Sequence, residues 1–556
     1  MKVCVILNRF NNGNPFTYNV DDKETNYNYM MPIGLSYISS ALKNNGDDVT
    51  FLNLNHRGGL IKDILNLEFK VNKYDFVFMG SLSFYYPNIR DYIKYIREAS
   101  PSTIIVVGGG LVSSQPVIML KLLKPDIAVI GEGEITVVEI VNCLKNMGGD
   151  LSKIDGIGYI APNGEIIINK PRLPIENLDS VAFPDHDGNE LSVFLDHMDP
   201  STFMIHDRFD VPRTYPLLMS RSCPFKCTFC YHQLGPKYRQ RSIDNIMEEI
   251  KAVTEKYKIN TFLAYDELFA QNKERIVEFC TKFKEFQKTI PWEIKWNCSL
   301  RVDNVNDDLI KMMKDAGCCM VGLGLESYSN TVLKSMNKHI TSDQIKRAME
   351  IITNNGLAIQ GTFIFGDSAE TLDTAKETLD FYKNNQNIIR GGVQLGFIVL
   401  FQGSPLYKHC VEKGIVKDEI QFIEDRSKNG YNFDKPENLT DSMSDSDFEK
   451  LKNDVMTTIY TTGYHVTPIE SKIVDNISEV HIKCPYCNEI SIFKNMHTPK
   501  NGEVQNVGCR HCNSRFGMVS NIYFIISPLM KFIGYNNMIK LSNIYHPIIR
   551  RLLFWR

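Results

Sequence analysis

The chain has 556 residues, more than one hydrophobic core usually supports, so two or three domains are expected. Hydrophobic residues make up 43% and charged residues 23%, and the net charge of -3 gives no general attraction to nucleic acid. We therefore expect no nucleic-acid partner. The first residues carry no secretion signal and no apolar run is long enough to span a membrane, so a cytoplasmic protein is expected. The 14 cysteines, clustered or isolated, indicate metal binding in a reducing compartment.

The first 150 residues alternate short apolar runs with amphipathic stretches. Buried parallel strands are predicted in KVCVILN, DVTFLNLN, YDFVFMGSL, TIIVVGGG and DIAVIGEGE, with helices over residues 33–45, 88–98, 114–123 and 135–147. This α/β pattern predicts a doubly wound, Rossmann-like sheet, which binds ligands at the carboxyl ends of its strands. The candidate binding residues there are Ser81, Gly108, Gly109, Gly110, Glu132 and Gly133. Tight turns explain the glycines equally well.

A second α/β region follows a short connecting segment. Residues 151–205 are interpreted as a hairpin around Asn163 and Gly164 and then a proline-rich linker. Over residues 206–400, strands are predicted in PLLMSRS, NTFLAYDEL, EIKWNCSLR, CMVGLGLES, AIQGTFIFG and VQLGFIVLF. Six strands with helices between them favour a partial (β/α)6 barrel, whose chemistry belongs at the carboxyl ends of the strands.

Three cysteines follow the first predicted barrel strand. In SRSCPFKCTFC, Cys223, Cys227 and Cys230 have the spacing CxxxCxxC. Three thiolates on one loop can hold three irons of a four-iron cluster, and they leave the fourth iron open to a small chelating molecule. The spacing alone also allows a zinc site completed by His232.

The stretch SCPFKCTFCYH resembles the signature of the radical S-adenosylmethionine (SAM) superfamily. YDELFAQN, WNCSLRVD, GLGLES and GTFIFGDSAET also resemble that family, in order, over about residues 217–385. The resemblance implies a 4Fe-4S cluster on the three cysteines, SAM bound to its open iron, and a 5′-deoxyadenosyl radical that abstracts hydrogen from a substrate. It implies SAM contacts from Phe229, Asp266, Glu267, Ser299, Arg301, Glu326 and Gly366. For the three carboxylates, an ordinary role at a strand end is the alternative.

The first domain resembles the cobalamin-binding module of cobalamin-dependent radical enzymes. The resemblance rests on MPIGLSYISSALKNNG, VVGGGLVSS, AVIGEGEIT and LDSVAFPD, and it implies that the candidate residues at the strand ends contact cobalamin. Proteins of this kind that supply a histidine to cobalt carry DxHxxG after the first strand, whereas this chain has NRFNNGNP there. His56 follows the second strand and lacks the aspartate, so we interpret it as a loop histidine. A bound cobalamin is therefore expected to lack a protein histidine ligand.

Together the two resemblances imply a cobalamin-dependent radical SAM methyltransferase. Its target would be an unactivated carbon or a phosphinate-like centre of a natural-product, peptide or lipid-like substrate, and a flavodoxin or ferredoxin would supply electrons. The alternative is hydrogen abstraction followed by cyclisation or rearrangement, with or without cobalamin. Methylthiotransferases of tRNA need three clustered cysteines in the first domain. Because this chain has only Cys4 and Cys143 there, we set that function aside. The sequence does not identify a catalytic base.

The last third of the chain is more polar. We expect a helical extension over residues 401–475, a metal ribbon over 476–520 and a basic, apolar tail over 521–556. Cys484, Cys487, Cys509 and Cys512 form two CxxC pairs, which are typical of structural zinc or a single rubredoxin-like iron, and zinc is favoured. Such a ribbon can also be a docking module. No acidic residue follows Glu503, so the tail is a candidate for peripheral contact with an anionic membrane; the alternative is packing on the barrel.

Among the isolated cysteines, Cys298 lies on a predicted barrel strand. We single it out as a residue that could face the substrate; the others are interpreted as small core residues.

Overall fold

The computed structural model describes residues 1–10, 23–145, 149–201, 204–232, 234–429, 436–474, 477–500 and 503–544. Most of NRFNNGNP, the last two residues of the fourth predicted helix and the end of the basic tail lie outside these ranges. The chain divides into two compact units. The first comprises residues 1–197, 220–242 and 399–434, and the second comprises residues 198–219, 243–398 and 435–556. The domain boundaries expected from the sequence remain predictions.

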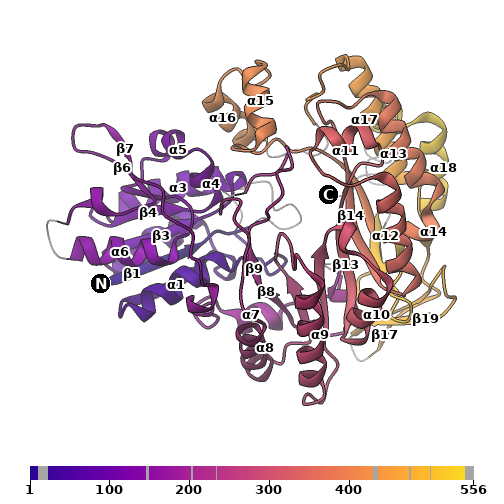
Figure 1. Cartoon of the computed structure of the whole chain (residues 1–556), viewed down its shortest axis with the longest axis horizontal. Helices are drawn as coiled ribbons and strands as arrows, with labels where there is room; N and C mark the ends of the chain where they lie inside the picture. Colours follow the sequence, from indigo (N-terminus) through magenta and orange to yellow (C-terminus); the bar gives the residue numbers. More distant parts are fainter. Residues whose placement is uncertain are drawn as a thin grey trace. The chain divides into compact units, whose positions relative to one another are not determined.

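The first unit is built on a seven-stranded sheet with the order β2-β1-β3-β4-β5-β6-β7 (Figure 1). Its strands are β1 (Lys2–Leu7), β2 (Asp48–Asn53), β3 (Phe76–Gly80), β4 (Ile104–Gly108), β5 (Ile127–Val129), β6 (Ile157–Ile160) and β7 (Ile166–Ile168). β1 to β5 pair in parallel, which confirms the predicted doubly wound sheet. The predicted hairpin, β6 and β7, extends this sheet as antiparallel strands and covers the edge of β5.

Helices cover both faces of this sheet. They are α1 (Gly34–Asn44), α2 (Ile61–Val71), α3 (Tyr86–Ala99), α4 (Gly110–Ser114), α5 (Pro116–Leu123) and α6 (Glu134–Lys145). The first unit also contains α7 (Leu191–Asp196), α15 (Pro405–Glu412) and α16 (Glu419–Asn429). α1 packs with α6, and a buried core joins the sheet to α2, α3 and α5. The sequence prediction omitted α2, although Ile61, Leu65 and Phe69 repeat every four residues and are buried. The helix predicted over residues 114–123 is confirmed as α5, but it begins two residues later, because Gln115 is not helical and separates α5 from α4.

The second unit contains a six-stranded parallel sheet with the order β15-β14-β13-β12-β11-β8. Its strands are β8 (Thr214–Leu217), β11 (Thr261–Ala264), β12 (Lys295–Leu300), β13 (Cys318–Glu326), β14 (Ala358–Phe365) and β15 (Val393–Phe397). The helices of this region are α8 (Ile243–Tyr257), α9 (Lys273–Gln287), α10 (Asp307–Asp315), α11 (Asn330–Ser335), α12 (Ser342–Asn354), α13 (Leu372–Asn384) and α14 (Gln386–Ile389). The predicted partial barrel is confirmed.

The first predicted barrel strand is divided in two. β8 ends at Leu217, and β9 (Ser220–Arg221) pairs instead with β10 (Arg239–Gln240) in an antiparallel stem. This stem belongs to the first unit, whereas β8 belongs to the second.

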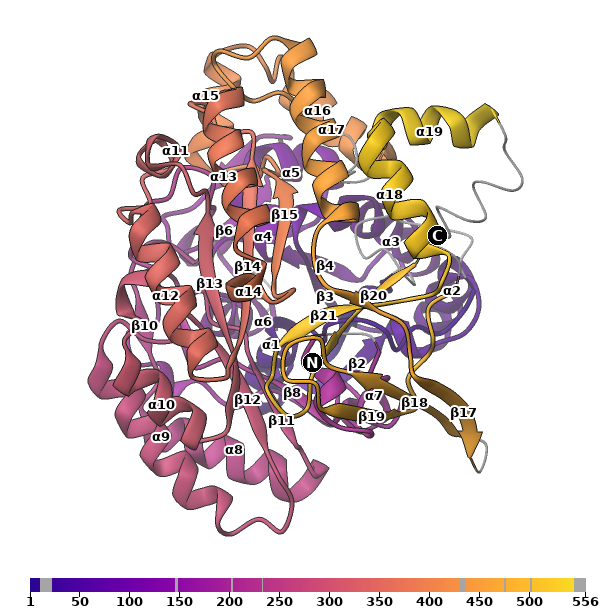
Figure 2. The same cartoon turned by 90° about the vertical axis from the view of Figure 1, so that its right-hand side faces the viewer.

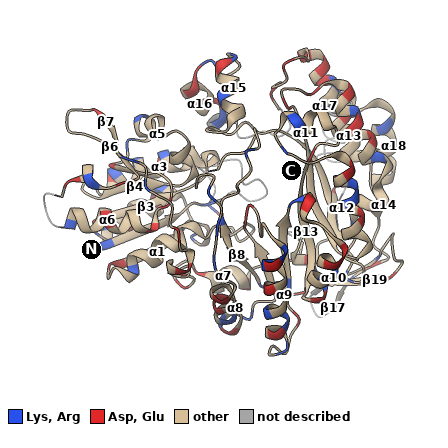
Figure 3. Cartoon of the chain, in the orientation of Figure 1, with Lys and Arg blue, Asp and Glu red and all other residues tan. Residues whose placement is uncertain are grey.

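Trp296 is an example of how a barrel strand packs its buried face against a helix. This β12 residue is fully buried, and its ring lies 5.0 Å from that of Phe279 and 6.0 Å from that of Phe269. Edge-to-face aromatic packing of this kind stabilises a core beyond the area it buries. Acidic and basic residues are interspersed on the helices that cover the sheet, as Figure 3 shows for α8 and α9.

The C-terminal part of the second unit consists of a helix, two small sheets and two further helices (Figure 2). The elements are α17 (Asp445–Thr461), β16 (His465–Val466), β17 (Glu470–Val474), β18 (Ile477–Lys483), β19 (Ile490–Lys494), β20 (Val504–Gly508), β21 (Arg515–Val519), α18 (Tyr523–Ile533) and α19 (Tyr535–Ile544). Among the described residues, no helix combines the length and the apolar composition needed to cross a bilayer.

Candidate functional site

The cysteine loop is carried between the two strands of the β9–β10 stem. Cys227 is 8% exposed, and Cys223 and Cys230 are half-buried. The loop turns tightly, because the backbone N–H of Cys230 donates to the carbonyl of Cys227 at 3.2 Å. All 14 cysteines are described, and none forms a disulfide. Three thiols on one partly accessible loop are a donor set that suits an iron-sulfur cluster.

A buried ion-pair network holds the base of this loop. Glu132, in the loop after β5, accepts hydrogen bonds from Arg221 Nη1 and Arg239 Nη1, each at 2.8 Å. Glu134 accepts from Arg221 Nη2 at 2.6 Å. Burial alone would raise the pKa of Glu132, but Arg221, the backbone N–H of Ile175 and Arg239 hold that pKa below its ordinary value. Glu132 is therefore an ionised partner of the stem, a role that the sequence did not indicate.

The glycines at the strand ends bring the β3 and β4 loops into close contact. Gly109 has a φ of 81°, and a Cβ there would lie 2.8 Å from the carbonyl oxygen of Ser81. Gly133 lies against α1, where a Cβ would be 2.7 Å from Ile38. Gly108 ends β4 and Gly110 begins α4. The chain thus requires glycine at 109, where the backbone of Ser81 leaves no room for a Cβ, whereas the neighbour of Gly133 is the flexible end of the Ile38 side chain. Contacts of this region with cobalamin remain a prediction.

His56 is engaged within the first unit. Its Nδ1 lies 2.8 Å from Glu190 Oε2 and its Nε2 lies 3.1 Å from the hydroxyl of Tyr29, while the side chain is 2% exposed. It is also the only histidine among the first 150 residues. These contacts support its interpretation as a loop histidine.

Three predicted SAM contacts gather at the carboxyl ends of β12 and β13. Glu326 has a φ of 59°, and its carboxylate binds Lys338 Nζ at 2.7 Å. Arg301 donates to the carbonyl of Lys338 at 3.2 Å and pairs with Asp303 at 3.0 Å. Ser299 lies beside Gly322, where a Cβ would be 2.9 Å from the serine Oγ. Lys338 is thus part of the group, although sequence reasoning missed it because a short helix, α11, separates it from Glu326.

The other predicted SAM contacts are distributed along the barrel and the cysteine loop. Asp266 is 5% exposed and accepts from the backbone N–H of Met219 at 3.0 Å, whereas Glu267 is exposed. Phe229 is half-buried in the cysteine loop.

Gly366 begins the loop after β14. Its φ is 100°, and its N–H donates to Glu370 Oε2 at 2.6 Å. Burial raises the pKa of Glu370 to about 8, the Gly366 hydrogen bond opposes that shift and the charge of Asp367 adds to it. Glu370 is therefore a largely neutral acid at pH 7 that fixes the Gly366 loop, and no local sequence pattern indicates this protonation state.

Cys298 faces the helices and not the interior of the barrel. It lies on the same face of β12 as Trp296, is 1% exposed, and hydrogen-bonds with Cys318, whose pKa burial raises well above its ordinary value. The expectation that Cys298 could face the substrate is wrong, because the alternation of the strand directs Ser299 to the other side.

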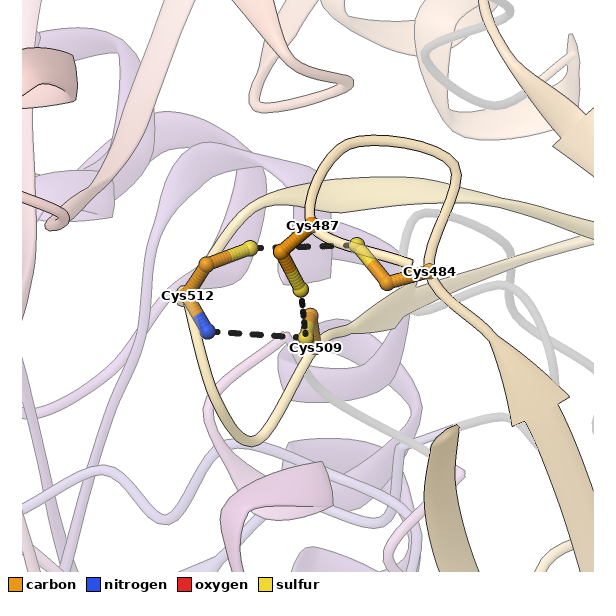
Figure 4. A group of neighbouring side chains, drawn as sticks. All are labelled: Cys484, Cys487, Cys509 and Cys512. Atoms are coloured by element: carbon orange, nitrogen blue, oxygen red, sulfur yellow. Dashed lines mark hydrogen bonds between the residues drawn. The ribbon is translucent and has the colours of Figure 1, made fainter. Parts of the chain in front are cut away.

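The four C-terminal cysteines form a closed group (Figure 4). Cys484 and Cys487 lie between β18 and β19, and Cys509 and Cys512 lie between β20 and β21; their four sulfurs lie within 4.8 Å of one another. Backbone N–H groups of Tyr486, His511 and Cys512 point at the sulfurs of Cys484 and Cys509, at 3.4 to 3.5 Å. Among the described residues, this is the group gathered closely enough for a single ion, and the cysteine triplet with His232 is not.

The two knuckles repeat one backbone design. Asn488 and Asn513, which directly follow the second cysteine of each pair, have φ of 63° and 59°. In each knuckle the asparagine N–H donates to the carbonyl of the first cysteine, at 3.1 and 3.0 Å. The left-handed asparagine closes the turn and directs both sulfurs inward, which suits tetrahedral binding of one ion.

The second knuckle is fixed to the segment that leads into the barrel. Asp207 accepts from the N–H of Gly508 at 2.7 Å and pairs with Arg515 at 3.0 Å. Arg208 donates to the carbonyl of Cys509 at 2.8 Å. Both residues lie just before β8, so the second knuckle contacts the segment that leads into the barrel.

Comparison with family models assigns both α/β regions. Residues 23–141 match the B12 binding domain, and residues 217–382 match the radical SAM superfamily. This chain is a radical SAM enzyme with a B12-binding domain. The B12 match covers β2 to β5, and the radical SAM match covers β8 to β14 with the cysteine loop.

Known proteins similar to this B12-binding radical SAM enzyme include an uncharacterized methyltransferase of Pyrococcus horikoshii, 29% identical over 63% of this chain and 73% of the relative. An anaerobic magnesium-protoporphyrin IX monomethyl ester cyclase of Rubrivivax gelatinosus is 25% identical over 62% of this chain and 61% of the relative. Among solved structures, the radical SAM methyltransferase TsrM of Kitasatospora setae matches with a TM-score of 0.59 and 16% identity, over 74% of this chain and 76% of TsrM. The last match establishes a likeness of fold.

Proposed function

We propose that the enzyme is a cobalamin-dependent radical SAM methyltransferase that acts on an unactivated carbon or a phosphinate-like centre of a natural-product, peptide or lipid-like substrate. The observation that carries the proposal is the presence, on one chain, of a B12-binding domain and a radical SAM domain with a CxxxCxxC loop. The methyltransferase relative, similar over 73% of its own length, supports methyl transfer.

Different residues would bind the cluster and SAM, according to their chemistry. Cys223, Cys227 and Cys230 would hold a 4Fe-4S cluster as thiolates. In the barrel, Arg301 offers a planar fork that suits the carboxylate of SAM, and Glu326 offers an acceptor for its amine or ribose hydroxyls. When bound, the cluster and SAM supply a 5′-deoxyadenosyl radical, and cobalamin supplies the methyl group.

The first sheet would bind cobalamin at the carboxyl ends of its strands. The order β2-β1-β3 places a topological switch point there, which is where doubly wound sheets bind ligands. Because both ring nitrogens of His56 are engaged, we propose that the cobalt has no protein histidine ligand.

The products of SAM test this function directly. In anaerobically reconstituted protein with a chemical reductant or flavodoxin, the proposal predicts both 5′-deoxyadenosine and S-adenosylhomocysteine when cobalamin is bound. Without cobalamin, only 5′-deoxyadenosine should form. Methyl-labelled SAM then identifies the acceptor in cell extract. Absence of S-adenosylhomocysteine from cobalamin-loaded protein would contradict methyl transfer.

Hydrogen abstraction with cyclisation or rearrangement is the second candidate. The similarity to the magnesium-protoporphyrin ester cyclase favours it, because that relative is named for ring closure. In this case labelled methyl would not appear in any product, and 5′-deoxyadenosine would form in proportion to the substrate consumed.

We propose zinc at the C-terminal cysteines and the cytoplasm as the location. The alternative metal is a single iron, since four thiolates bind either ion. Elemental analysis distinguishes them: about one zinc per chain supports the proposal, whereas iron beyond that of the cluster contradicts it.

The outer face of α18 is proposed to contact anionic lipid. One face of this helix packs on α17, with the Tyr523 hydroxyl donating to the carbonyl of Tyr460 at 2.6 Å. The other face carries Ile525 and Phe532, 74% and 88% exposed. No acidic residue follows Glu503, so charge favours an anionic surface. Sedimentation with phosphatidylglycerol vesicles, but not with phosphatidylcholine vesicles, should be lost in Phe532→Ser. Equal sedimentation of the variant would contradict the contact.

A further inference from the structure

The two strands at the base of the cysteine loop converge on one carboxylate of the first sheet. Arg221 lies on β9, shortly before Cys223, and Arg239 lies on β10, after the loop has returned. Both guanidinium groups bind Glu132, so this residue joins the entry and the exit of the loop. The side chains of Glu132, Arg221 and Arg239 are 4%, 6% and 3% exposed, which removes the screening by water that weakens surface pairs.

The network is balanced in charge and extends to two further elements. Glu134 takes the second nitrogen of Arg221, so two carboxylates face two guanidinium groups. The guanidinium of Arg221 also lies 5.5 Å from the ring centre of Tyr37 on α1. Neutralising Glu132 would leave buried positive charge without its main partner, a change that proteins tolerate poorly.

The tip of the loop is held within the same unit. The N–H of Leu406, in the first turn of α15, donates to the carbonyl of Thr228 at 2.8 Å. Gly403 allows close approach, since a Cβ there would lie 2.7 Å from the ring of Tyr231. The loop is therefore attached to the first unit at its stem and near its tip.

We propose that Glu132 is a positioning residue for the iron-sulfur site, which fixes the stem of the CxxxCxxC loop on the sheet of the B12-binding domain. This inference rests on the proposed cluster, and it replaces the predicted role of Glu132 as a cobalamin contact. The carboxylate acts through the two arginines and holds the three thiols in one arrangement before metal binds.

The test compares Glu132→Gln with a matched control, Glu139→Gln. Glu139 pairs with Arg172 in the same unit, but its side chain is 43% exposed. In metal-free protein, amide hydrogen exchange in the β9 and β10 peptides should be at least about tenfold faster in Glu132→Gln than in wild type or Glu139→Gln. After reconstitution, iron release to a chelator should accelerate by about the same factor, and the electron paramagnetic resonance spectrum of the reduced cluster should change. The affinity for hydroxocobalamin should not change.

Each other outcome has a distinct meaning. Unchanged exchange in the stem peptides would overturn the proposal, and so would faster exchange spread evenly over the first unit. A loss of hydroxocobalamin affinity with an intact stem would return Glu132 to the cobalamin site. If wild-type protein takes up no iron, the proposed function fails, while hydrogen exchange still decides the role of Glu132. Should Glu132→Gln not fold, Arg221→Lys, which keeps the charge but loses the separate donors to Glu132 and Glu134, serves as the second variant.

Discussion

The chain carries two groups of cysteines that differ in the number of their thiols and in what holds them in place. The C-terminal group has four thiols that close on one another within 4.8 Å, each pair on a knuckle with a left-handed asparagine. The loop over residues 223–230 has three thiols, and it is braced by a buried ion-pair network at its stem. Under the proposed function, the complete set of four thiols would hold a structural ion, whereas the three thiols on the braced loop would leave a position for a reactant. The number of cysteines, more than their spacing, separates the two roles.

The largest expected effect comes from removing one thiol of the three-cysteine loop over residues 223–230. Cys227→Ala should lower formation of 5′-deoxyadenosine by at least about 100-fold, because a cluster on two ligands is not retained. Liquid chromatography of SAM products measures the effect. The control is Cys280→Ala, a buried cysteine on α9 that belongs to neither group. Equal activity of Cys227→Ala and wild type would assign the cluster elsewhere.

The second largest effect concerns Arg301, one of the predicted SAM contacts at the carboxyl ends of β12 and β13. Arg301→Ala should raise the KM for SAM about 10- to 100-fold, since charge-assisted hydrogen bonds are worth about 1.5–3 kcal/mol. Lys311→Ala is the matched control, because it removes a positive charge from an exposed pair with Asp307 on α10. If both variants shift KM equally, the effect is one of general charge and the predicted contact is wrong.

Removing one thiol of the C-terminal four-cysteine group should lower the stability of the protein without changing its cleavage of SAM. Cys509→Ser should lower the unfolding temperature of the second unit by about 5–10 °C, because Cys509 joins the metal site to the segment before β8. Formation of 5′-deoxyadenosine per folded chain should not change. Thermal unfolding followed by circular dichroism provides the measurement, with the exposed His511→Ala as control. Loss of SAM cleavage in folded Cys509→Ser would make the ribbon part of the reaction.

The smallest effect concerns Glu370, which fixes the Gly366 loop in the barrel. Its pKa is about 8 in the folded protein against an ordinary value of 4.5. As pH rises from 4.5 to 8, the unfolded chain loses this proton first, so the folded state loses stability across that window and no further above it. Relative to wild type, Glu370→Gln should therefore gain a few degrees in unfolding temperature between pH 5 and pH 9. A constant difference across that range would show that the carboxyl is not protonated in the fold.

Much of the fold followed from the sequence because its strands are strongly apolar. Both parallel sheets were predicted, although the predicted strand PLLMSRS shares only residues 216–217 with β8. The family resemblance and the four-cysteine group were predicted from motifs. The helix α2 was missed despite the spacing of Ile61, Leu65 and Phe69. Contacts between separate elements left no local pattern: Lys338 reaches Glu326 across the short helix α11, and Arg239 reaches Glu132 from a distant part of the chain. The orientation of Cys298 could not be predicted, because it depends on which residues of β12 face the helices.

The most direct test of this account is a count of iron, zinc and cobalt in protein reconstituted without oxygen in the presence of hydroxocobalamin, with Cys227→Ala alongside. We expect about four irons, one zinc and one cobalt per wild-type chain, with the absorption of a cobalamin lacking a nitrogen ligand from the protein. Cys227→Ala should lose the iron and keep the zinc and cobalt. Four irons retained in Cys227→Ala, or wild-type protein that binds no cobalt, would contradict the account.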